Sequence, residues 1–207
     1  VVFISTGSVY DGAQGYYHES MPRGPLNTYG RHKAAVEEWL EARLPEAFIP
    51  RLDKVVGDDP AEPHLFSDWF RAVEEGRPVR CIAGQLFSPT LVDDIARGIL
   101  LGAQRGLRGP YHVATPEFFY RDELARQFLA AWGRAVPVET IPQESLGFVE
   151  PRGLKSYLDG SRFVAATDLR FTTMREAFTT FLRRAGQRVA AGRAQQPTEE
   201  RRAHAAV

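Results

Sequence analysis

The chain has very little cysteine and no excess of charge of either sign. Cys81 is the single cysteine of 207 residues, which excludes a framework of internal disulfides, and its apolar surroundings (Val79–Ile82) predict a buried side chain. The 26 Lys and Arg residues balance the 26 Asp and Glu residues, so no overall field attracts nucleic acid or an anionic membrane. A reducing cytoplasm is the expected location.

Long apolar runs, metal-ligand spacing and a phosphate-binding turn are also missing. No apolar stretch reaches the ~18 residues of a membrane span, and the five histidines have no spacing typical of a metal site. A dinucleotide fold needs a Gly-rich turn between a strand and a helix to hold the pyrophosphate, and no segment has that pattern with the right flanks. Neither a metal, a membrane nor nucleic acid is therefore expected as a partner.

The first residues, Val1–Ile4, have the composition of a strand that is buried on both faces of a parallel sheet. Such a strand needs neighbours. We therefore expect the chain to be the later part of a longer protein, preceded by on the order of 100 residues of a nucleotide-binding half. Without that half, the edges of Val1–Ile4 should be unpaired and the chain should be inactive on its own.

What is present is an alternation of helical and extended patterns, which is typical of an α/β fold. Apolar spacing predicts helices over about 29–44, 64–75, 91–103, 122–132 and 174–186. It predicts strands at 1–4, 47–49, 79–83, 111–114 and 138–141. The three tryptophans lie at helical spacing from other apolar residues, so we expect them in the core: Trp39, Trp69 and Trp132.

The first predicted helix carries the strongest chemical signal. Asn27 or Thr28 caps it, and Val36, Leu40 and Leu44 are spaced for one buried face, with Glu37, Glu38 and Glu41 on another. Tyr29 and Lys33 stand four residues apart near its start, so their side chains share one face. An ammonium group and the positive end of a helix both favour the phenolate form of tyrosine. The pair can therefore donate or accept a proton.

A hydroxyl upstream completes a carbonyl-reduction site. Thr6 follows the predicted first strand, where its side chain can hydrogen-bond a substrate carbonyl while Tyr29 supplies a proton. Around these residues the sequence resembles the active-site block of the dTDP-4-dehydrorhamnose reductases, which are extended short-chain dehydrogenases/reductases of the NAD-dependent epimerase/dehydratase superfamily. The matching segments are Ser5–Gly12, Tyr17-x-Glu19, Pro25–Lys33 and Glu37.

Two later segments extend the resemblance to roughly residues 1–180. Phe87–Ala96 is similar to the Ser-Pro-Thr segment of that family, and Gly109–Val113 to its Gly-x-Tyr-His strand. The resemblance implies a Rossmann-like doubly wound parallel sheet, whose C-terminal part with the catalytic motif would be residues 1–60. Residues 61–186 would form a small α/β substrate-binding subdomain with returning sheet elements, and residues 187–207 are expected to be a disordered tail.

The resemblance also implies a function: reduction of a nucleotide-linked 4-keto-deoxysugar with NADPH or NADH. Tyr29 would be the acid, Lys33 would favour its ionised form and hold the nicotinamide ribose, and Thr6 would polarise the carbonyl. Tyr29, Lys33 and Arg51 are the candidate cofactor-binding residues. The candidate substrate-binding residues are Ser5, Ser8, Ser88, Pro89, Thr90 and Arg152. Ser88–Thr90 is equally well interpreted as a helix N-cap in which Thr90 bonds the first-turn amides. A homodimer is a possible assembly.

Two alternatives stay open. The reductases usually carry Asp after the catalytic Thr, whereas this chain has Gly7, and Gly7–Tyr10 is closer to the sugar-nucleotide epimerases and dehydratases of the superfamily. The missing pyrophosphate turn also permits a non-catalytic regulatory or binding module, such as the regulatory subunit of methionine adenosyltransferase. The intact set of Thr6, Tyr29 and Lys33 favours the reductase, because a binding module has no chemical need for all three.

Overall fold

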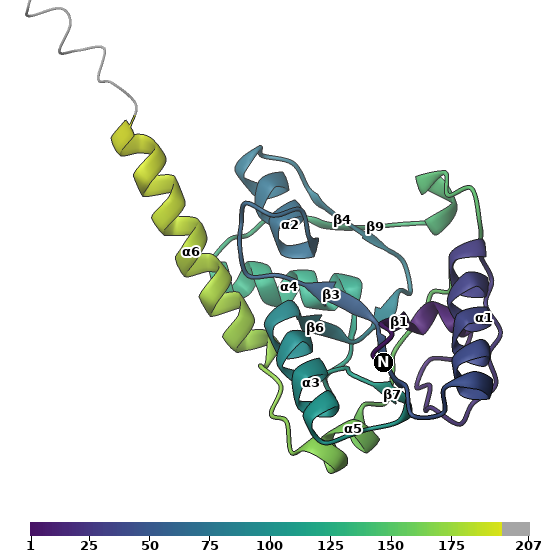
Figure 1. Ribbon diagram of the computed structural model, residues 1–207. Helices are drawn as coiled ribbons and strands as arrows, with labels where there is room; N and C mark the ends of the chain where they lie inside the picture. Colours follow the sequence, from purple (N-terminus) through teal and green to yellow (C-terminus); the bar gives the residue numbers. More distant parts are fainter. Residues whose placement is uncertain (196–207) are drawn as a thin grey trace, which may run out of the picture.

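The protein was analysed as a computed structural model, which describes the backbone of residues 1–195 and the side chains of residues 1–190. Its elements confirm the α/β prediction (Figure 1). The helices are α1 (Thr28–Arg43), α2 (Leu65–Glu74), α3 (Val92–Gln104), α4 (Arg121–Trp132), α5 (Ser161–Thr167) and α6 (Met174–Gln195), with 3-10 turns η1 (Gly7–Val9) and η2 (Gln143–Leu146). The strands are β1 (Ser5–Thr6), β2 (Phe48–Leu52), β3 (Lys54–Val56), β4 (Val79–Ile82), β5 (Leu86–Phe87), β6 (Pro89–Leu91), β7 (Gly109–His112), β8 (Phe119–Tyr120) and β9 (Val138–Ile141).

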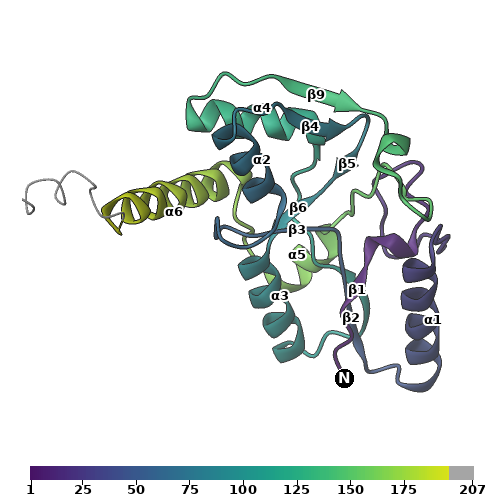
Figure 2. The ribbon, with the colours of Figure 1, turned by 90° about the horizontal axis from the view of Figure 1, so that it is seen from above.

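Strands β1, β2 and β7 form a parallel sheet in the order β1-β2-β7. Helix α1 covers one face of this sheet, and α3 and α5 cover the other (Figures 1 and 2). The remaining strands pair two by two: β3 with β6 and β4 with β9 in parallel, and β5 with β8 antiparallel. Because β1 and β2 run in parallel, their carboxyl ends meet at the same edge of the sheet, the usual place for a site in an α/β fold.

The largest apolar core lies away from this sheet, where α2, α4 and α6 pack against β4. Aromatic rings dominate it, with Phe66, Phe128 and Phe181 fully buried and in mutual contact. Smaller clusters hold the sheet to its helices, such as Phe48 with Phe163 under β2 and β7. The region of α2, α4 and α6 and the region of the β1-β2-β7 sheet therefore each have an apolar core.

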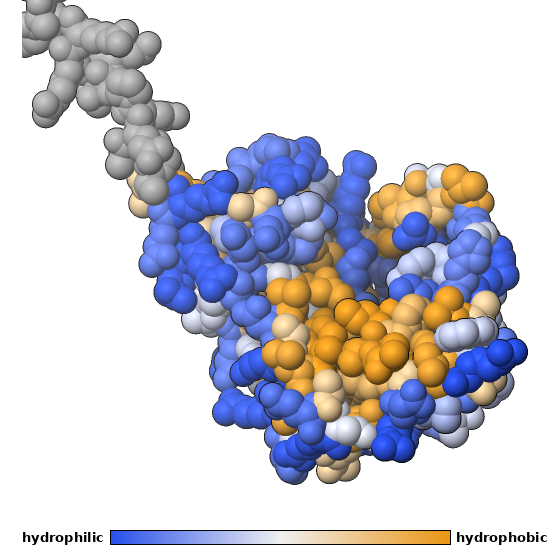
Figure 3. All heavy atoms as spheres, viewed as in Figure 1, coloured by the Kyte–Doolittle hydropathy of each residue, from blue (hydrophilic) through white to orange (hydrophobic). Residues whose placement is uncertain are grey.

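The side chains of residues 1–4 are less buried than the sequence predicted. Main-chain hydrogen bonds join Val1 and Phe3 to Phe48 at 3.0 and 2.9 Å, so the chain is extended beside β2. Yet Val1, Val2 and Ile4 are 71%, 43% and 47% exposed, and within residues 1–195 β1 pairs only with β2. Apolar side chains gather over this edge, between α1 and α3 (Figure 3). The edge of β1 is thus open, as the sequence predicted for a chain without further strands there.

The buried face of α1 also differs from the prediction. Gly30, Ala34, Glu37 and Leu40 are its buried residues, whereas Val36 is 39% exposed. Trp39 is 55% exposed and is not a core residue; Trp69 is buried as predicted and Trp132 packs against the core. The face turned to the sheet is narrow and built of small residues, because α1 lies close to η1 and β1.

Helix α5 was not predicted, and the boundaries of the other helices agree with the sequence to within about two residues, except at the end of α6. Helix α6 continues to Gln195 instead of ending near Gly186, so residues 187–195 of the predicted tail are helical. The rest of that tail, residues 196–207, lies outside the described residues. Among the helices of residues 1–195, none combines the length and hydropathy of a membrane span.

Candidate active site

A large cleft opens at the carboxyl ends of β1 and β2. Its volume is about 1270 Å³, more than the ~300–1,000 Å³ of common small-molecule sites. One wall is η1 with the start of α1; the other is formed by β4, β9, the start of α4 and the loop after η2. Four of the predicted site residues line it: Thr6, Ser8, Tyr29 and Arg152.

The start of α1 is fixed against η1 by two local features. Asn27 caps the helix, its side-chain oxygen accepting a hydrogen bond of 2.8 Å from the Gly30 amide. Gly30 has no side chain where the helix touches η1: a Cβ there would lie 2.2 Å from the Ser8 carbonyl oxygen. Only glycine permits this contact without a shift of the backbone. As a result, the residue before it, Tyr29, stands at the cleft beside the turn that carries Thr6.

Two of the three predicted catalytic residues, Thr6 and Tyr29, line the cleft, and Lys33 lies outside its lining. Tyr29 is 55% exposed. Lys33 lies one turn further along α1, with its Nζ 5.9 Å from the centre of the Tyr29 ring, and donates a hydrogen bond of 2.8 Å to the Ile4 carbonyl oxygen. The Thr6 hydroxyl accepts from the Ser8 amide at 3.1 Å, capping η1. The arrangement places a phenol and a hydroxyl at the cleft, with an ammonium group anchored behind the phenol.

The loop after η2 closes the same end of the cleft, a feature that the sequence did not predict. Glu150 accepts hydrogen bonds from the amide and hydroxyl of Thr28 at 2.9 and 2.6 Å and pairs with Arg31 at 3.1 Å. The hydrogen bonds from Thr28 lower the pKa of this carboxyl group. A negative charge at the first turn of α1 also suits the helix dipole. The loop therefore supports the helix that carries Tyr29.

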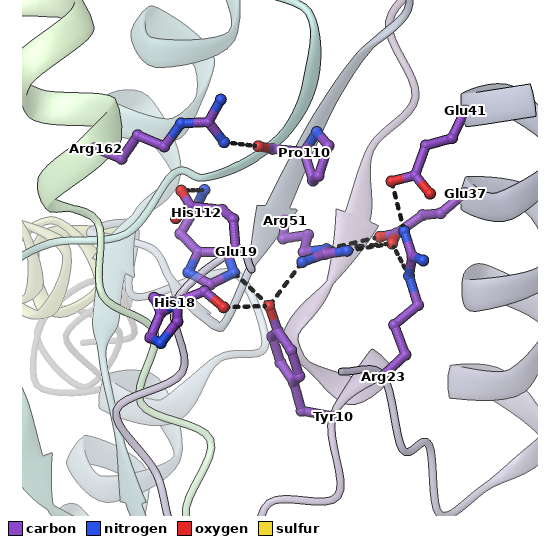
Figure 4. A network of polar contacts seen from close by, with 10 residues as sticks. All are labelled: Tyr10, His18, Glu19, Arg23, Glu37, Glu41, Arg51, Pro110, His112 and Arg162. Carbon is purple, nitrogen blue, oxygen red and sulfur yellow. Dashed lines mark hydrogen bonds and ion pairs between the residues drawn. The ribbon is translucent and has the colours of Figure 1, made fainter. Parts of the chain in front are cut away.

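Behind the cleft, α1 is held to β2 by a buried ion pair (Figure 4). The Arg51 guanidinium donates to Glu37 at 2.6 Å through Nη2 and at 3.0 Å through Nε. Arg23 donates to the same carboxylate at 2.7 Å. Burial on its own would raise the pKa of Glu37, but the hydrogen bonds and charge of Arg51 outweigh it and hold this pKa below its usual value. The sequence prediction that Glu37 faces away from the sheet is thus wrong.

The same network continues into the sheet through two aromatic side chains. Arg51 donates to the Tyr10 hydroxyl at 2.6 Å, and this hydroxyl lies 3.0 Å from His112 Nε2 on β7. Burial raises the pKa of Tyr10 to about 12 and lowers the pKa of His112 to about 4. Both side chains are therefore neutral near pH 7, and the network joins η1, α1, β2 and β7.

Several predicted ligand contacts have other roles in the structure. Arg51 is 1% exposed and its guanidinium is engaged by Glu37 and Tyr10, so it serves packing and not a cofactor. Ser5 is 2% exposed, and the Ser88–Thr90 segment is buried and lines no part of the cleft. Thr90 accepts from the Thr115 amide at 3.1 Å, and α3 has no side-chain cap. Neither interpretation of Ser88–Thr90 from the sequence is supported by this geometry.

Besides Glu150, a second carboxyl group that lines the cleft was not predicted from the sequence. Asp53 follows β2, lines the cleft and accepts a hydrogen bond of 2.6 Å from the Ser88 amide. Burial raises the pKa of Asp53 to about 7. Among the described residues, no group of three or more His, Cys, Asp or Glu side chains is placed to hold a metal ion.

Comparisons with known proteins agree with the fold. Residues 1–187 match the family model of the RmlD substrate binding domain. The dTDP-4-dehydrorhamnose reductase of Mycobacterium tuberculosis is 30% identical over 163 residues, which cover 76% of this chain and 53% of that protein. The beta subunit of methionine adenosyltransferase 2 from Danio rerio is 30% identical over 132 residues, 60% of this chain and 41% of that protein.

A solved structure is similar over most of the chain. The dTDP-4-dehydrorhamnose reductase of Bacillus anthracis, determined in complex with NADP, superimposes with a TM-score of 0.76 at 25% identity. The match covers 87% of this chain and 64% of that one. Against the curated relatives above, the chain spans about half of their length.

Proposed function

Because the chain belongs to the RmlD substrate binding domain family, we propose that it provides the substrate site and the proton donor of an NAD(P)H-dependent reductase. The substrate class is a nucleotide-linked 4-keto-deoxysugar, as the names of its reductase relatives suggest. One observation carries the proposal: Thr6 and Tyr29 line the same end of a cleft of about 1270 Å³, with Lys33 on the Tyr29 face of α1.

The chemistry follows from what these side chains can donate. The substrate carbonyl oxygen accepts hydrogen bonds from the Thr6 and Tyr29 hydroxyls, which withdraw electron density from the carbonyl carbon. As that carbon gains a hydride, Tyr29 passes its proton to the oxygen, and the product is an alcohol. The phenolate that remains is stabilised by Lys33 and takes its next proton from solvent.

NADPH or NADH, when bound, supplies the hydride. Tyr29 and Lys33, one turn apart on α1, would hold the nicotinamide ribose of such a cofactor. The residues present offer no site for its pyrophosphate, because no Gly-rich turn before a helix exists in residues 1–195. We propose that an additional α/β segment supplies it, docked on the open edge of β1 where Val1, Val2 and Ile4 are exposed.

Residues 1–60 with β7 would belong to the sheet shared with that segment, and the rest of residues 61–186 to the substrate side. A cytoplasmic location and a homodimer are also proposed; light scattering of the purified protein tests the dimer. Neither nucleic acid nor a membrane is proposed as a partner.

The test is turnover by the complete gene product that contains these residues. NAD(P)H oxidation is measured with dTDP-4-dehydrorhamnose as substrate, in the unchanged protein and in Tyr29→Phe. We expect a loss of about 100-fold or more in kcat for Tyr29→Phe, with little change in substrate affinity. Equal rates in both proteins would refute the role of Tyr29.

Two alternatives give different outcomes in that assay. A sugar-nucleotide epimerase or dehydratase would convert a nucleotide sugar without net consumption of NAD(P)H. A non-catalytic module, favoured by the similarity to the methionine adenosyltransferase subunit, would show no turnover and would form a stable complex with a protein partner.

A further inference from the structure

One carboxyl group of the cleft has no part in the proposed reaction. Asp53 is half-buried, follows β2 and lines the cleft. The Cα atoms of Thr6 and Leu52 are partners in the register of β1 and β2, so Asp53 lies just past the point where Thr6 ends the neighbouring strand. Neighbouring strands lie about 4.8 Å apart. The separation of Asp53 from Thr6 is therefore comparable to the breadth of a sugar ring with its hydroxyls.

The surroundings of Asp53 differ from those of the fully buried carboxyl groups. Within residues 1–190 these groups belong to Glu37 and Asp94, which are 0% and 1% exposed, and an arginine pairs with each. In the same part of the chain no Lys, Arg or His nitrogen lies within 4.0 Å of the Asp53 oxygens. Asp53 thus has no ion pair there that would account for a carboxyl group at this position.

The fold has no need of a carboxyl group here either. The Ser88 amide donates to Oδ2 of Asp53 at 2.6 Å, a hydrogen bond that the oxygen of a neutral side chain accepts equally well. Burial raises the pKa of Asp53 to about 7, because the Ser156 side chain and the charge of Lys54 offset the desolvation only in part. An ionisable group at this position therefore costs free energy near neutral pH. Groups of this kind are concentrated at functional sites.

The chemistry of Asp53 suits a hydroxyl group as its ligand. A carboxylate offers about four acceptor positions. The Ser88 amide takes one of them, and the Ser156 side chain and the Lys54 amide approach the same group, which leaves capacity for a ligand in the cleft. A hydroxyl donates to the ionised form and accepts from the protonated form, whereas a phosphate group is repelled by the ionised form.

We propose that Asp53 is a specificity-determining residue, which binds a hydroxyl of the sugar ring beside the carbonyl that Thr6 and Tyr29 polarise. The inference rests on the proposed function for the identity of the ligand as a sugar nucleotide. With the carbonyl held on one side and a hydroxyl on the other, the ring is fixed in one orientation at the cleft. A sugar without that hydroxyl leaves the carboxyl group unpaired, so the site discriminates against it.

Equilibrium binding to the complete gene product tests the inference without turnover. The probes are dTDP, dTDP-rhamnose, which is the alcohol that the proposed reaction forms, and the 2-deoxy and 3-deoxy counterparts of dTDP-rhamnose. Asp53→Ala should weaken the binding of dTDP-rhamnose about 10- to 100-fold and leave the binding of dTDP unchanged, because dTDP has no sugar for Asp53 to contact. One of the two deoxy compounds should bind the unchanged protein and Asp53→Ala with equal affinity.

A purely structural role of Asp53 gives a different result. Asp53→Ala would then weaken dTDP and dTDP-rhamnose by the same factor, or neither of them, and both results would overturn the inference. An unchanged protein that binds dTDP-rhamnose no more tightly than dTDP would overturn it as well. Asp53→Asn keeps the shape of the side chain and should lose less affinity than Asp53→Ala, because a hydrogen bond to a neutral group is the weaker one.

Asp93→Ala is the control, since Asp93 is exposed on α3 and lies outside the lining of the cleft; it should change none of the four affinities. The inference and the proposed function fail separately. Selective weakening of dTDP-rhamnose by Asp53→Ala in a protein without reductase turnover would keep the inference and remove the proposed function. Turnover without selective weakening would remove the inference and keep the proposed function.

Discussion

Two regions of the molecule contain buried or half-buried arginines, and the regions differ in whether the arginine has an anion. Behind α1, the Arg51 guanidinium is buried but fully engaged by Glu37 and Tyr10. In the cleft, Arg121 has a buried Nε with no partner among the described residues. A buried cation that has its anion joins elements of the fold, whereas a buried donor without a partner costs free energy.

Helix α1 connects the two regions. Its first turn carries Tyr29 at the cleft, and two turns later Glu37 enters the buried network. The network therefore fixes the distance and direction of Tyr29 from the sheet without touching a ligand. In this sense Glu37 and Arg51 are positioning residues.

The largest effect on stability is expected from a substitution in the buried ion pair behind α1. Glu37→Gln leaves the Arg51 guanidinium buried without its anion, which should lower the free energy of unfolding by about 3–5 kcal/mol. Urea denaturation measures the loss. The control is Glu41→Gln, which removes a half-exposed partner of Arg23 and should cost at most about 1 kcal/mol. Similar losses in both variants would contradict the assigned role of the buried pair.

A second substitution lies in α1, at its contact with η1. Gly30→Ala places a methyl group 2.2 Å from the Ser8 carbonyl oxygen, so α1 must move away from η1. We expect a loss of about 1–3 kcal/mol in stability and reduced turnover, because Tyr29 moves with the helix. Gly186→Ala is the matched helical control, since nothing lies within 4 Å of that position; it should be neutral or slightly stabilising. Comparable losses would show that the contact with η1 is not tight.

The cleft should respond to pH through Asp53. Its pKa is raised by burial from 3.8 to about 7, so the unfolded chain releases this proton at lower pH than the folded protein. The free energy of unfolding should therefore fall as pH rises from about 4 to about 7. Asp53→Asn should remove that part of the fall and stabilise the protein by about 1–2 kcal/mol above pH 7. Parallel pH–stability curves for the two proteins would contradict this.

The smallest effect on stability is expected from a substitution of Arg121 in the cleft. Arg121→Gln removes a charge that has no anion, so the free energy of unfolding without ligand should change by less than about 1 kcal/mol, unlike the effect of Glu37→Gln. Thermal denaturation with and without dTDP measures it. A large loss of stability without ligand would show that Arg121 serves folding.

Helix α1 has features that could be predicted from the sequence and features that could not. The Asn27 cap and the spacing of Tyr29 and Lys33 are local features, and the structure confirms the predicted helix and its cap. The burial of Glu37 could not be predicted from α1 alone, because its partner Arg51 lies on a strand 14 residues away. The exposure of Trp39 and Val36 has the same origin: the face turned to the sheet is chosen by Gly30, Ala34 and the ion pair, not by apolar content.

In the cleft, too, the sequence did not predict which residues from distant elements lie together. Arg152 was a candidate from the sequence, but Lys54 and Arg121 were not, since they come together only when β3, α4 and the loop after η2 are placed. The Ser88–Thr90 segment was misjudged for a similar reason. Its residues form and precede a three-residue strand, β6, that pairs with β3, and strands this short leave no period in the sequence.

The most direct test of the account is the fate of the hydride in the complete gene product. NADPH carrying deuterium at its transferable position is supplied with dTDP-4-dehydrorhamnose, and the product is analysed by mass spectrometry and NMR. The account predicts one deuterium on the former carbonyl carbon, and none when Tyr29→Phe replaces the unchanged protein over the same time. A product without deuterium, or no product at all, would contradict the claim that a sugar carbonyl is reduced in this cleft beside Thr6 and Tyr29, with Lys33 behind the phenol.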